Sequence, residues 1–229
     1  MPIQGLHRVI IQAALAAVLR KGIDGVALGG GNALIARAGS HRATQDIDVF
    51  VKDPANVSAA STEIIEAIER AGYRVEREDD PLGGMWDDEE ELHVKLLVTV
   101  PGNQAAEVEV EVSHFEYDRD EDLPGLGRVL SLDDIGGFKT KAVAERMAPR
   151  DFVDYAVLRD QGYTAERLFE LARQRDPGLG PADYADAARH LDRLADSRLA
   201  PYLAPHLGRD AAWVRRAFAG WSRDNRRGQ

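Results

Sequence analysis

The chain has 229 residues, a formal net charge of −10 and no cysteine. Disulfide bonds, thiolate metal sites and cysteine nucleophiles are therefore excluded, and this negative charge disfavours indiscriminate binding of nucleic acid over the whole surface. The apolar runs are too short to span a bilayer, and the first of them reads as part of an amphipathic helix and not as a signal peptide. We therefore expect a cytoplasmic protein with no membrane segment.

Apolar periodicity predicts alternating helices and strands in the first half of the chain. The last two of these strands are expected to form a hairpin around Pro101-Gly102-Asn103. Ser58 or Ser61 is a candidate N-cap of the third helix. The predicted helices cover residues 3–20, 32–39 and 55–73, and the predicted strands cover residues 25–28, 46–51, 92–100 and 107–113.

The second half of the chain has helical apolar patterns throughout. Pro149 suits the first turn of one of these helices. Turn residues in LPGLG, at residues 123–127, separate this half from the first. We therefore predict an α/β first domain and an all-helical second domain. The predicted helices of the second domain cover residues 131–147, 149–162, 164–176, 180–196 and 209–227.

Two aspartates, Asp46 and Asp48, lie one residue apart in the predicted strand at residues 46–51. Side chains alternate along a strand, so both carboxylates face the same side. Mg²⁺ prefers carboxylates, waters and substrate phosphates as ligands. If the strand at 107–113 is a neighbour, one of its alternating glutamates supplies a third carboxylate for a two-metal site. Each strand taken alone is also compatible with a solvated polar face.

Three glycines, Gly29, Gly30 and Gly31, follow the predicted strand at residues 25–28 and precede a short helix. Glycines leave backbone N–H groups uncovered, and the amino end of a helix favours an anion, so this turn is a candidate phosphate site. Asn32 is placed either to cap the helix or to hydrogen-bond a phosphate oxygen. A glycine turn alone is more often plain loop geometry, and the nearby Asp-x-Asp pair makes the pattern more specific.

This order of motifs resembles the nucleotidyltransferase superfamily that includes DNA polymerase β. The signature of that superfamily is an apolar residue and a glycine turn, then Asp-x-Asp or Asp-x-Glu, then a third carboxylate on a later strand. The resemblance implies an α+β fold with a nucleotidyltransferase-like mixed sheet flanked by helices and followed by a helical C-terminal region. The nucleotidyltransferase domain would cover residues 1–125 and the helical domain residues 126–229. The matching residues are Leu28, Gly29, Gly30, Gly31, Asn32, Asp46 and Asp48, with Asn32 where the family often has serine.

The segment FKTKAVAERMAPRDFVDYAVL further resembles the AbiEii/AbiGii-type nucleotidyltransferase toxins of abortive-infection and toxin–antitoxin systems. HRATQDIDVFV also resembles that family around Arg42 and Thr44, which the resemblance assigns to nucleotide binding. In the same comparison, Glu111 is the third carboxylate of the metal site. The motif in the longer segment falls on Lys139, Arg146, Arg150, Asp151 and Asp154.

Within this motif, the resemblance implies that Lys139 steadies the triphosphate and that Asp151 orients Lys139 or the incoming nucleophile. Lys139 and Arg146 fall on one helical face together with Ala142 and Val143, so both cations are expected to point the same way. A network of ion pairs that only ties helices together is the alternative for all of these charges.

These residues favour a nucleotidyltransferase that uses two Mg²⁺ ions and moves a nucleoside monophosphate from an NTP to an acceptor hydroxyl. The resemblance implies a toxin that acts on a tRNA end or on a protein and is neutralised by an antitoxin protein. An antibiotic nucleotidyltransferase stays open, because the acidic loop at 78–91 suits a cationic aminoglycoside. A catalytically silent module that binds nucleotide or protein is a further alternative. The basic end at 209–229 could contact a phosphate backbone locally.

Overall fold

The computed structural model describes residues 5–78, 92–101 and 103–222. The described residues form two compact units, which we call the sheet unit (5–36 and 44–131) and the helical unit (37–43 and 132–222). The division predicted after residue 125 falls within the sheet unit, because strand β7 follows it and pairs with β1. Apart from Glu78, the acidic loop at 78–91 lies outside the described residues.

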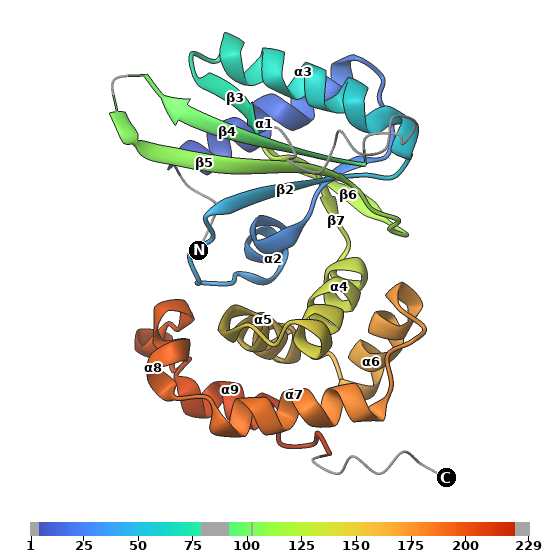
Figure 1. Ribbon diagram of the computed structural model, residues 1–229, viewed down its shortest axis with the longest axis vertical. Coiled ribbons are helices and arrows are strands. Elements are labelled where there is room, and N and C mark those ends of the chain that lie inside the picture. The colour runs from blue at the N-terminus through green and yellow to red at the C-terminus, as the bar shows by residue number, and fades with distance from the viewer. Residues whose placement is uncertain (1–4, 79–91, 102, 223–229) are drawn as a thin grey trace. The chain divides into compact units, whose positions relative to one another are not determined.

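The sheet unit contains a seven-stranded sheet with the order β3-β4-β5-β2-β1-β7-β6 (Figure 1). β2 runs parallel to β5, and β1 runs parallel to β7, whereas the other neighbours are antiparallel. This confirms the predicted mixed sheet. The strands are β1 (Val26–Leu28), β2 (Asp46–Val51), β3 (Arg74–Glu78), β4 (His93–Val100), β5 (Asn103–His114), β6 (Asp120–Leu123) and β7 (Gly127–Leu130).

The sequence pattern predicts β1, β2, β4 and β5 but does not predict the other three strands. β3 and β6 are the two edge strands, and most of their side chains are at least partly exposed, so they lack an apolar alternation. β6 and β7 form a hairpin whose turn contains the LPGLG segment. That segment therefore turns the chain within the sheet and does not join the two units.

Helices α1 (Gly5–Arg20) and α3 (Val57–Arg70) cover one face of the sheet, and α2 (Gly30–Ala38) lies on the other (Figure 1). A short 3-10 helix, η1 (Pro54–Asn56), precedes α3. The predicted N-caps of α3 are wrong. The hydroxyl of Ser61 donates to the carbonyl oxygen of Val57 at 2.8 Å, inside the helix.

The core of the sheet unit follows the alternation of the central strands. Ile47 and Val49 of β2 and Val110 and Val112 of β5 are completely buried. Because successive side chains point to opposite faces, the residues between them are directed to the other face of the sheet. The hydrophobic pattern therefore fixes the direction of the acidic side chains on β2 and β5.

The helical unit has a core rich in aromatic side chains. The ring nitrogen of Trp221 donates to the hydroxyl of Tyr155 at 2.8 Å, and both rings pack against Phe218. Within the described part of the chain, every helix is too short or too polar to pass through a lipid bilayer. The helices of this unit are α4 (Leu132–Glu145), α5 (Pro149–Asp160), α6 (Ala165–Arg175), α7 (Pro181–Arg193), α8 (Asp196–Leu199), η2 (Ala200–Tyr202), η3 (Pro205–Leu207) and α9 (Ala211–Ala217).

Candidate active site

Three of the predicted site residues lie on the two central strands of the sheet unit. In the parallel pairing of β2 with β5, Asp48 is opposite Glu111 and Asp46 is opposite Glu109. Side chains that are opposite each other on neighbouring strands point to the same face, and the strands are about 4.8 Å apart. The predicted third carboxylate requires the strand with the alternating glutamates to be a neighbour of the Asp-x-Asp strand. In the structure β5 is the direct neighbour of β2.

The pKa of Glu111 is raised at this face of the sheet, where the other acidic side chains lie close by. Burial raises it first, the negative charge of Asp48 raises it next, and a hydrogen bond with Glu109 adds to the effect, so that the pKa reaches about 7. Asp46 contributes a smaller repulsion in the same direction. A divalent cation would relieve this repulsion, because it stabilises the ionised form of every carboxylate around it.

Lys95 of β4 distinguishes the two glutamates. Its ammonium group lies 2.7 Å from a carboxylate oxygen of Glu109 and 3.2 Å from one of Glu78. Glu109 is therefore paired with a cation, and Glu111 is the glutamate whose ionisation is opposed by Asp48. This difference favours Glu111 over Glu109 as the third carboxylate, in agreement with the resemblance.

Gly30 explains why the motif needs a bare backbone. Its φ angle is +56°, and a Cβ atom at this position would lie 1.6 Å from Oδ2 of Asp48. Only glycine adopts this conformation readily and also leaves room for the carboxylate. α2 begins at Gly30, so the carboxylate of Asp48 contacts the amino end of a helix, where a negative charge is stabilised.

Gly29 has a related role, since its N–H donates to the carbonyl oxygen of Asp48 at 2.8 Å. A Cβ atom on Gly29 would lie 2.8 Å from the ring of Phe50. The glycines thus bring β2 and the start of α2 into close contact. Phosphate binding by Gly29, Gly30 and Gly31 stays a prediction, and Asp48 already occupies part of the helix end.

A Gly30→Ala substitution is expected to displace the Asp48 carboxylate and to lower nucleotide transfer about 100-fold, because a shift of about 1 Å in a reacting group costs that much. The left-handed backbone adds a loss of about 1–2 kcal/mol in the free energy of unfolding. Gly39→Ala is the matched control. Its φ angle is +59°, and nothing lies within 4 Å of the position that the added methyl group would take. Urea unfolding and transfer rates of both variants test this, and equal activities would contradict it.

Asn32 and Thr44 both act on Asp46. The buried amide of Asn32 donates to the backbone carbonyl of Asp46 at 2.8 Å, and the hydroxyl of Thr44 donates to Oδ1 of Asp46 at 2.6 Å. The two donors fix the start of β2 and the direction of its first carboxylate. In the structure the side-chain nitrogen of Asn32 therefore bonds to the backbone of Asp46. The sequence suggests instead that Asn32 caps the helix or binds a phosphate oxygen.

His7 is a neighbour of this group that the sequence reasoning misses. Its Nδ1 lies 3.4 Å from the amide nitrogen of Asn32. Burial lowers the pKa of His7, although the hydrogen bond with Asn32 and the charge of Asp46 oppose this shift. Neutral His7 can therefore accept a hydrogen bond from Asn32. The sequence gives no sign that His7 lies near Asn32 and Asp46, because α1 brings it there through the tertiary structure.

The charged motif residues of the helical unit form two separate ion clusters. In the first, Asp154 accepts from Nε and Nη2 of Arg42 at 2.5 and 2.8 Å and lies 2.9 Å from the ammonium group of Lys139. In the second, Asp151 accepts from Nε and Nη2 of Arg146 at 2.8 and 2.6 Å. The ion pair of Lys139 is therefore with Asp154 and not with Asp151. The other expected role of Asp151, to orient the incoming nucleophile, stays a prediction.

Two further residues are expected from the sequence to act with this group. Arg146 is the first residue after α4, and its N–H donates to the carbonyl oxygen of Ala142 at 3.0 Å, as in a helical turn, so the expectation that it points the same way as Lys139 stays a prediction. Arg42, assigned to nucleotide by the resemblance, is buried against Asp154. Burial alone would raise the pKa of Asp154, but Lys139 and Arg42 together lower it below its ordinary value. Asp154 is thus an ionised carboxylate shared by two buried cations.

The donor set of Asp46, Asp48 and Glu111 suits Mg²⁺ chemically, because all three are hard oxygen ligands that repel one another. As the side chains stand, residues 5–78, 92–101 and 103–222 contain no group of three or more histidine or acidic residues arranged to hold a metal ion. Side-chain movements on β2 and β5 would be needed for all three to share one ion.

Solved structures show what class of fold this is. MenT4, a nucleotidyltransferase toxin from Mycobacterium tuberculosis H37Rv, is 15% identical, with a TM-score of 0.59 over 93% of this chain and 82% of that chain. JHP933 from Helicobacter pylori is 16% identical, with a TM-score of 0.55 over 92% of this chain and 88% of that chain. The fold is that of a nucleotidyltransferase.

The sequence identifies the family within this class. Residues 13–214 match the family described as nucleotidyl transferase AbiEii toxin, Type IV TA system. The chain belongs to this family and is a toxin nucleotidyltransferase, as the resemblance implied. A comparison with curated protein sequences found no match.

Proposed function

We propose that this toxin transfers a nucleoside monophosphate from an NTP to an acceptor hydroxyl in a Mg²⁺-dependent reaction. The observation that carries the proposal is the parallel pairing of Asp48 with Glu111, beside Asp46 and the glycine turn. Such a set of carboxylates suits two-metal nucleotidyl transfer. Two ions are proposed, which Asp46 and Asp48 would hold, and Glu111 would either bind the second ion or take the acceptor proton.

In the proposed reaction, the acceptor oxygen attacks the α-phosphorus, the bond to the β-phosphate oxygen breaks, and pyrophosphate leaves. Mg²⁺, when bound, would neutralise phosphate charge and orient the attacking and leaving oxygens. The alternative role for Glu111, in place of binding the second ion, is to take the acceptor proton with its carboxylate. Thr44 and Asn32 hold Asp46 in position throughout.

Lys139 is proposed to steady the triphosphate, as the resemblance implies. A lysine ammonium is a compact point charge suited to phosphate oxygens. Arg42 and Asp154 support this role indirectly. Asp154 restrains the lysine side chain, with its carboxylate 2.9 Å from the ammonium group, and Arg42 in turn holds Asp154.

A tRNA end or a protein is the proposed acceptor, and an antitoxin protein is the proposed partner. Both proposals depend on the family to which the chain belongs. Two of the three arginines of the basic end that fall within the described residues make ion pairs: Arg209 with Asp160 at 3.4 Å and Arg215 with Asp196 at 2.8 Å. Contact of this end with RNA would therefore compete with intramolecular pairs.

The test is to incubate the protein with each α-labelled NTP, Mg²⁺, and either total RNA or total protein of the host cell. The proposal expects label on one class of acceptor, and expects growth arrest on expression. Label on an aminoglycoside with drug resistance would instead identify the antibiotic-modifying alternative. Tight NTP binding without transfer to any acceptor would identify the catalytically silent alternative, and absence of both binding and transfer would refute nucleotide chemistry.

Glu111 gives the proposed site a pH dependence. Its pKa is about 7 in the folded protein and near 4.5 when unfolded. Between these values the folded state holds a proton that the unfolded state has lost, so the free energy of unfolding of the metal-free protein falls as pH rises. Mg²⁺ needs the ionised carboxylate, so its affinity is expected to rise with pH through about 7 and to level off above it.

Titration calorimetry with MgCl₂ at pH 5.5, 7 and 8 measures this dependence, and urea unfolding at the same pH values measures the metal-free protein. Glu111→Gln is expected to remove both trends and to weaken Mg²⁺ binding. Glu107→Gln changes an exposed glutamate on the same face of β5 and should keep both trends. A Mg²⁺ affinity with equal pH dependence in wild type and Glu111→Gln would contradict the assignment.

A further inference from the structure

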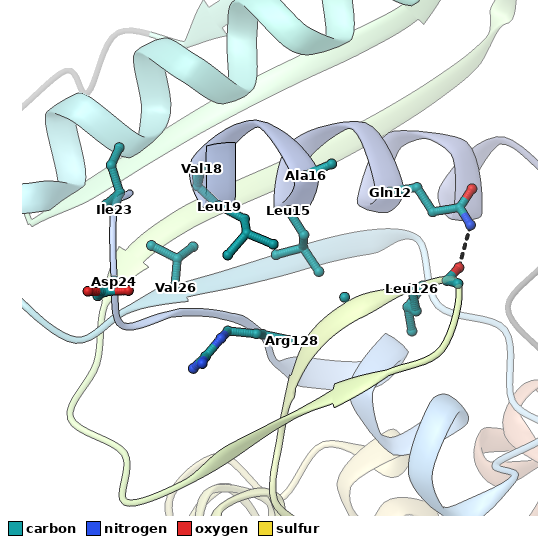
Figure 2. A pocket seen from close by; sticks show the side chains of 12 residues that line it. Gln12, Leu15, Ala16, Val18, Leu19, Ile23, Asp24, Val26, Leu126 and Arg128 are labelled. Atoms are coloured by element: carbon teal, nitrogen blue, oxygen red, sulfur yellow. Dashed lines mark hydrogen bonds between the residues drawn. The ribbon is translucent and has the colours of Figure 1, made fainter. Parts of the chain in front are cut away.

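A cavity of about 270 Å³ opens on the surface of the sheet unit, apart from the carboxylates (Figure 2). α1, the turn that leads into β1, and the β6–β7 hairpin surround it. Most of its lining is apolar. The apolar side chains that line it are Leu15, Ala16, Val18, Leu19, Ile23, Val26 and Leu126.

Contacts at one end of the cavity hold the hairpin against α1. The side-chain amide of Gln12 donates to the carbonyl oxygen of Gly125, as Figure 2 shows. Gly127 has a φ angle of +107°, and a Cβ atom there would lie 3.1 Å from Cβ of Leu15. The hairpin is therefore seated closely beside Leu15. Elsewhere the lining includes Leu19, which keeps 65% of its surface exposed, so the cavity is accessible from solvent.

The size and lining of the cavity indicate what class of molecule fits. An apolar cavity of about 150 Å³ is large enough to bind benzene. This cavity has nearly twice that volume and is lined by aliphatic side chains, so it has room for two fused aromatic rings. Burial of such rings against aliphatic groups is favourable by the hydrophobic effect.

Two charged side chains, Asp24 and Arg128, also line the cavity. Arg128 is already paired, with Nη1 2.6 Å from Oδ1 of Asp120. Asp24 is exposed and makes no ion pair with any cation among the described residues. A ligand with a cationic group would therefore find an available carboxylate, whereas an anionic group would have to compete with Asp120 for Arg128.

We propose that this cavity binds a small aromatic amine, with its rings against Leu15, Leu19 and Leu126 and its ammonium group at Asp24. The cavity wall includes Val26 of β1, the strand that continues through Leu28 into the glycine turn. One wall of the cavity is therefore part of the strand that leads to the candidate active site. The inference concerns binding alone and does not depend on nucleotide transfer.

Tryptamine is the probe, because it combines two fused rings with a primary ammonium group. Titration followed by methyl chemical shifts of the full chain is expected to show one saturable site that shifts leucine signals of the cavity. Asp24→Asn is expected to weaken tryptamine binding about threefold to fivefold, the upper part of the range for an exposed ion pair, and to leave binding of neutral indole unchanged.

Leu19→Trp places a larger side chain at the exposed rim and is expected to weaken both tryptamine and indole at least tenfold. Leu207→Trp is the matched control, because Leu207 is also an exposed leucine, 48% accessible, in the helical unit. Absence of saturable tryptamine binding, or binding that Leu19→Trp leaves intact, would overturn the site. Tighter binding of indole-3-acetate than of tryptamine would overturn the assignment of an amine.

Discussion

Asp48→Asn is expected to lower nucleotide transfer about a thousandfold, equivalent to roughly 4 kcal/mol of transition-state stabilisation. Asp48 is the proposed ligand that connects β2 with Glu111 on β5, and its carboxylate contacts Gly30 at the start of α2. The asparagine has nearly the same shape, so the backbone is expected to be unchanged. Single-turnover assays with an α-labelled NTP, read together with circular dichroism, measure this effect.

The same substitution has a second expected result, which is a change in the pKa of Glu111. After burial, the charge of Asp48 is the largest cause of the raised pKa of Glu111. Asp48→Asn should therefore move this pKa back toward its ordinary value, which carboxyl carbon shifts in an NMR titration would follow. Glu107→Gln is the control for both measurements. Transfer within about tenfold of wild type would rule out Asp48 as a metal ligand.

Asp154→Ala is expected to lower the free energy of unfolding by about 3–5 kcal/mol, because it leaves two buried cations without their shared carboxylate. Arg42 and Lys139 are 7% and 8% exposed, and Asp154 is completely buried. Urea unfolding measures the loss. The matched control is Glu170→Ala, which removes an exposed partner 2.9 Å from Arg167 and should cost no more than about 1 kcal/mol.

Lys139→Met separates the structural role of this cluster from its catalytic role. Methionine keeps much of the side-chain volume, and Asp154 keeps its two hydrogen bonds from Arg42. The free energy of unfolding should therefore change much less than in Asp154→Ala. If Lys139 steadies the triphosphate, transfer should still fall strongly. A variant that is stable and fully active would show that Lys139 only ties helices together.

Much of the candidate site follows from the sequence, because the alternation of side chains along a strand can be read from a few consecutive residues. Alternation in DIDVFV directs Asp46 and Asp48 to one face, and burial of Ile47 and Val49 on the other face requires it. Edge strands carry no such signal. Every side chain of β3 and β6 is at least partly exposed, so their sequences give no reason to expect strands.

Only the tertiary structure decides which carboxylates and cations are partners. Alternation makes Glu107, Glu109 and Glu111 equivalent, and the pairing of β5 with β2 and of Lys95 with Glu109 distinguishes them. Similarly, only the packing of the helices shows that Lys139 pairs with Asp154 and not with Asp151.

The sequence by itself thus determined the family motifs, the order of the central elements and the face on which Asp46 and Asp48 lie. These properties depend on residue type and on periods of two or 3.6 residues. The tertiary structure decided the strand register, the contact of Gly30 with Asp48 and the cluster of Arg42, Lys139 and Asp154. Such contacts join residues far apart in the chain, and the local periodicity of a sequence does not show which distant residues meet.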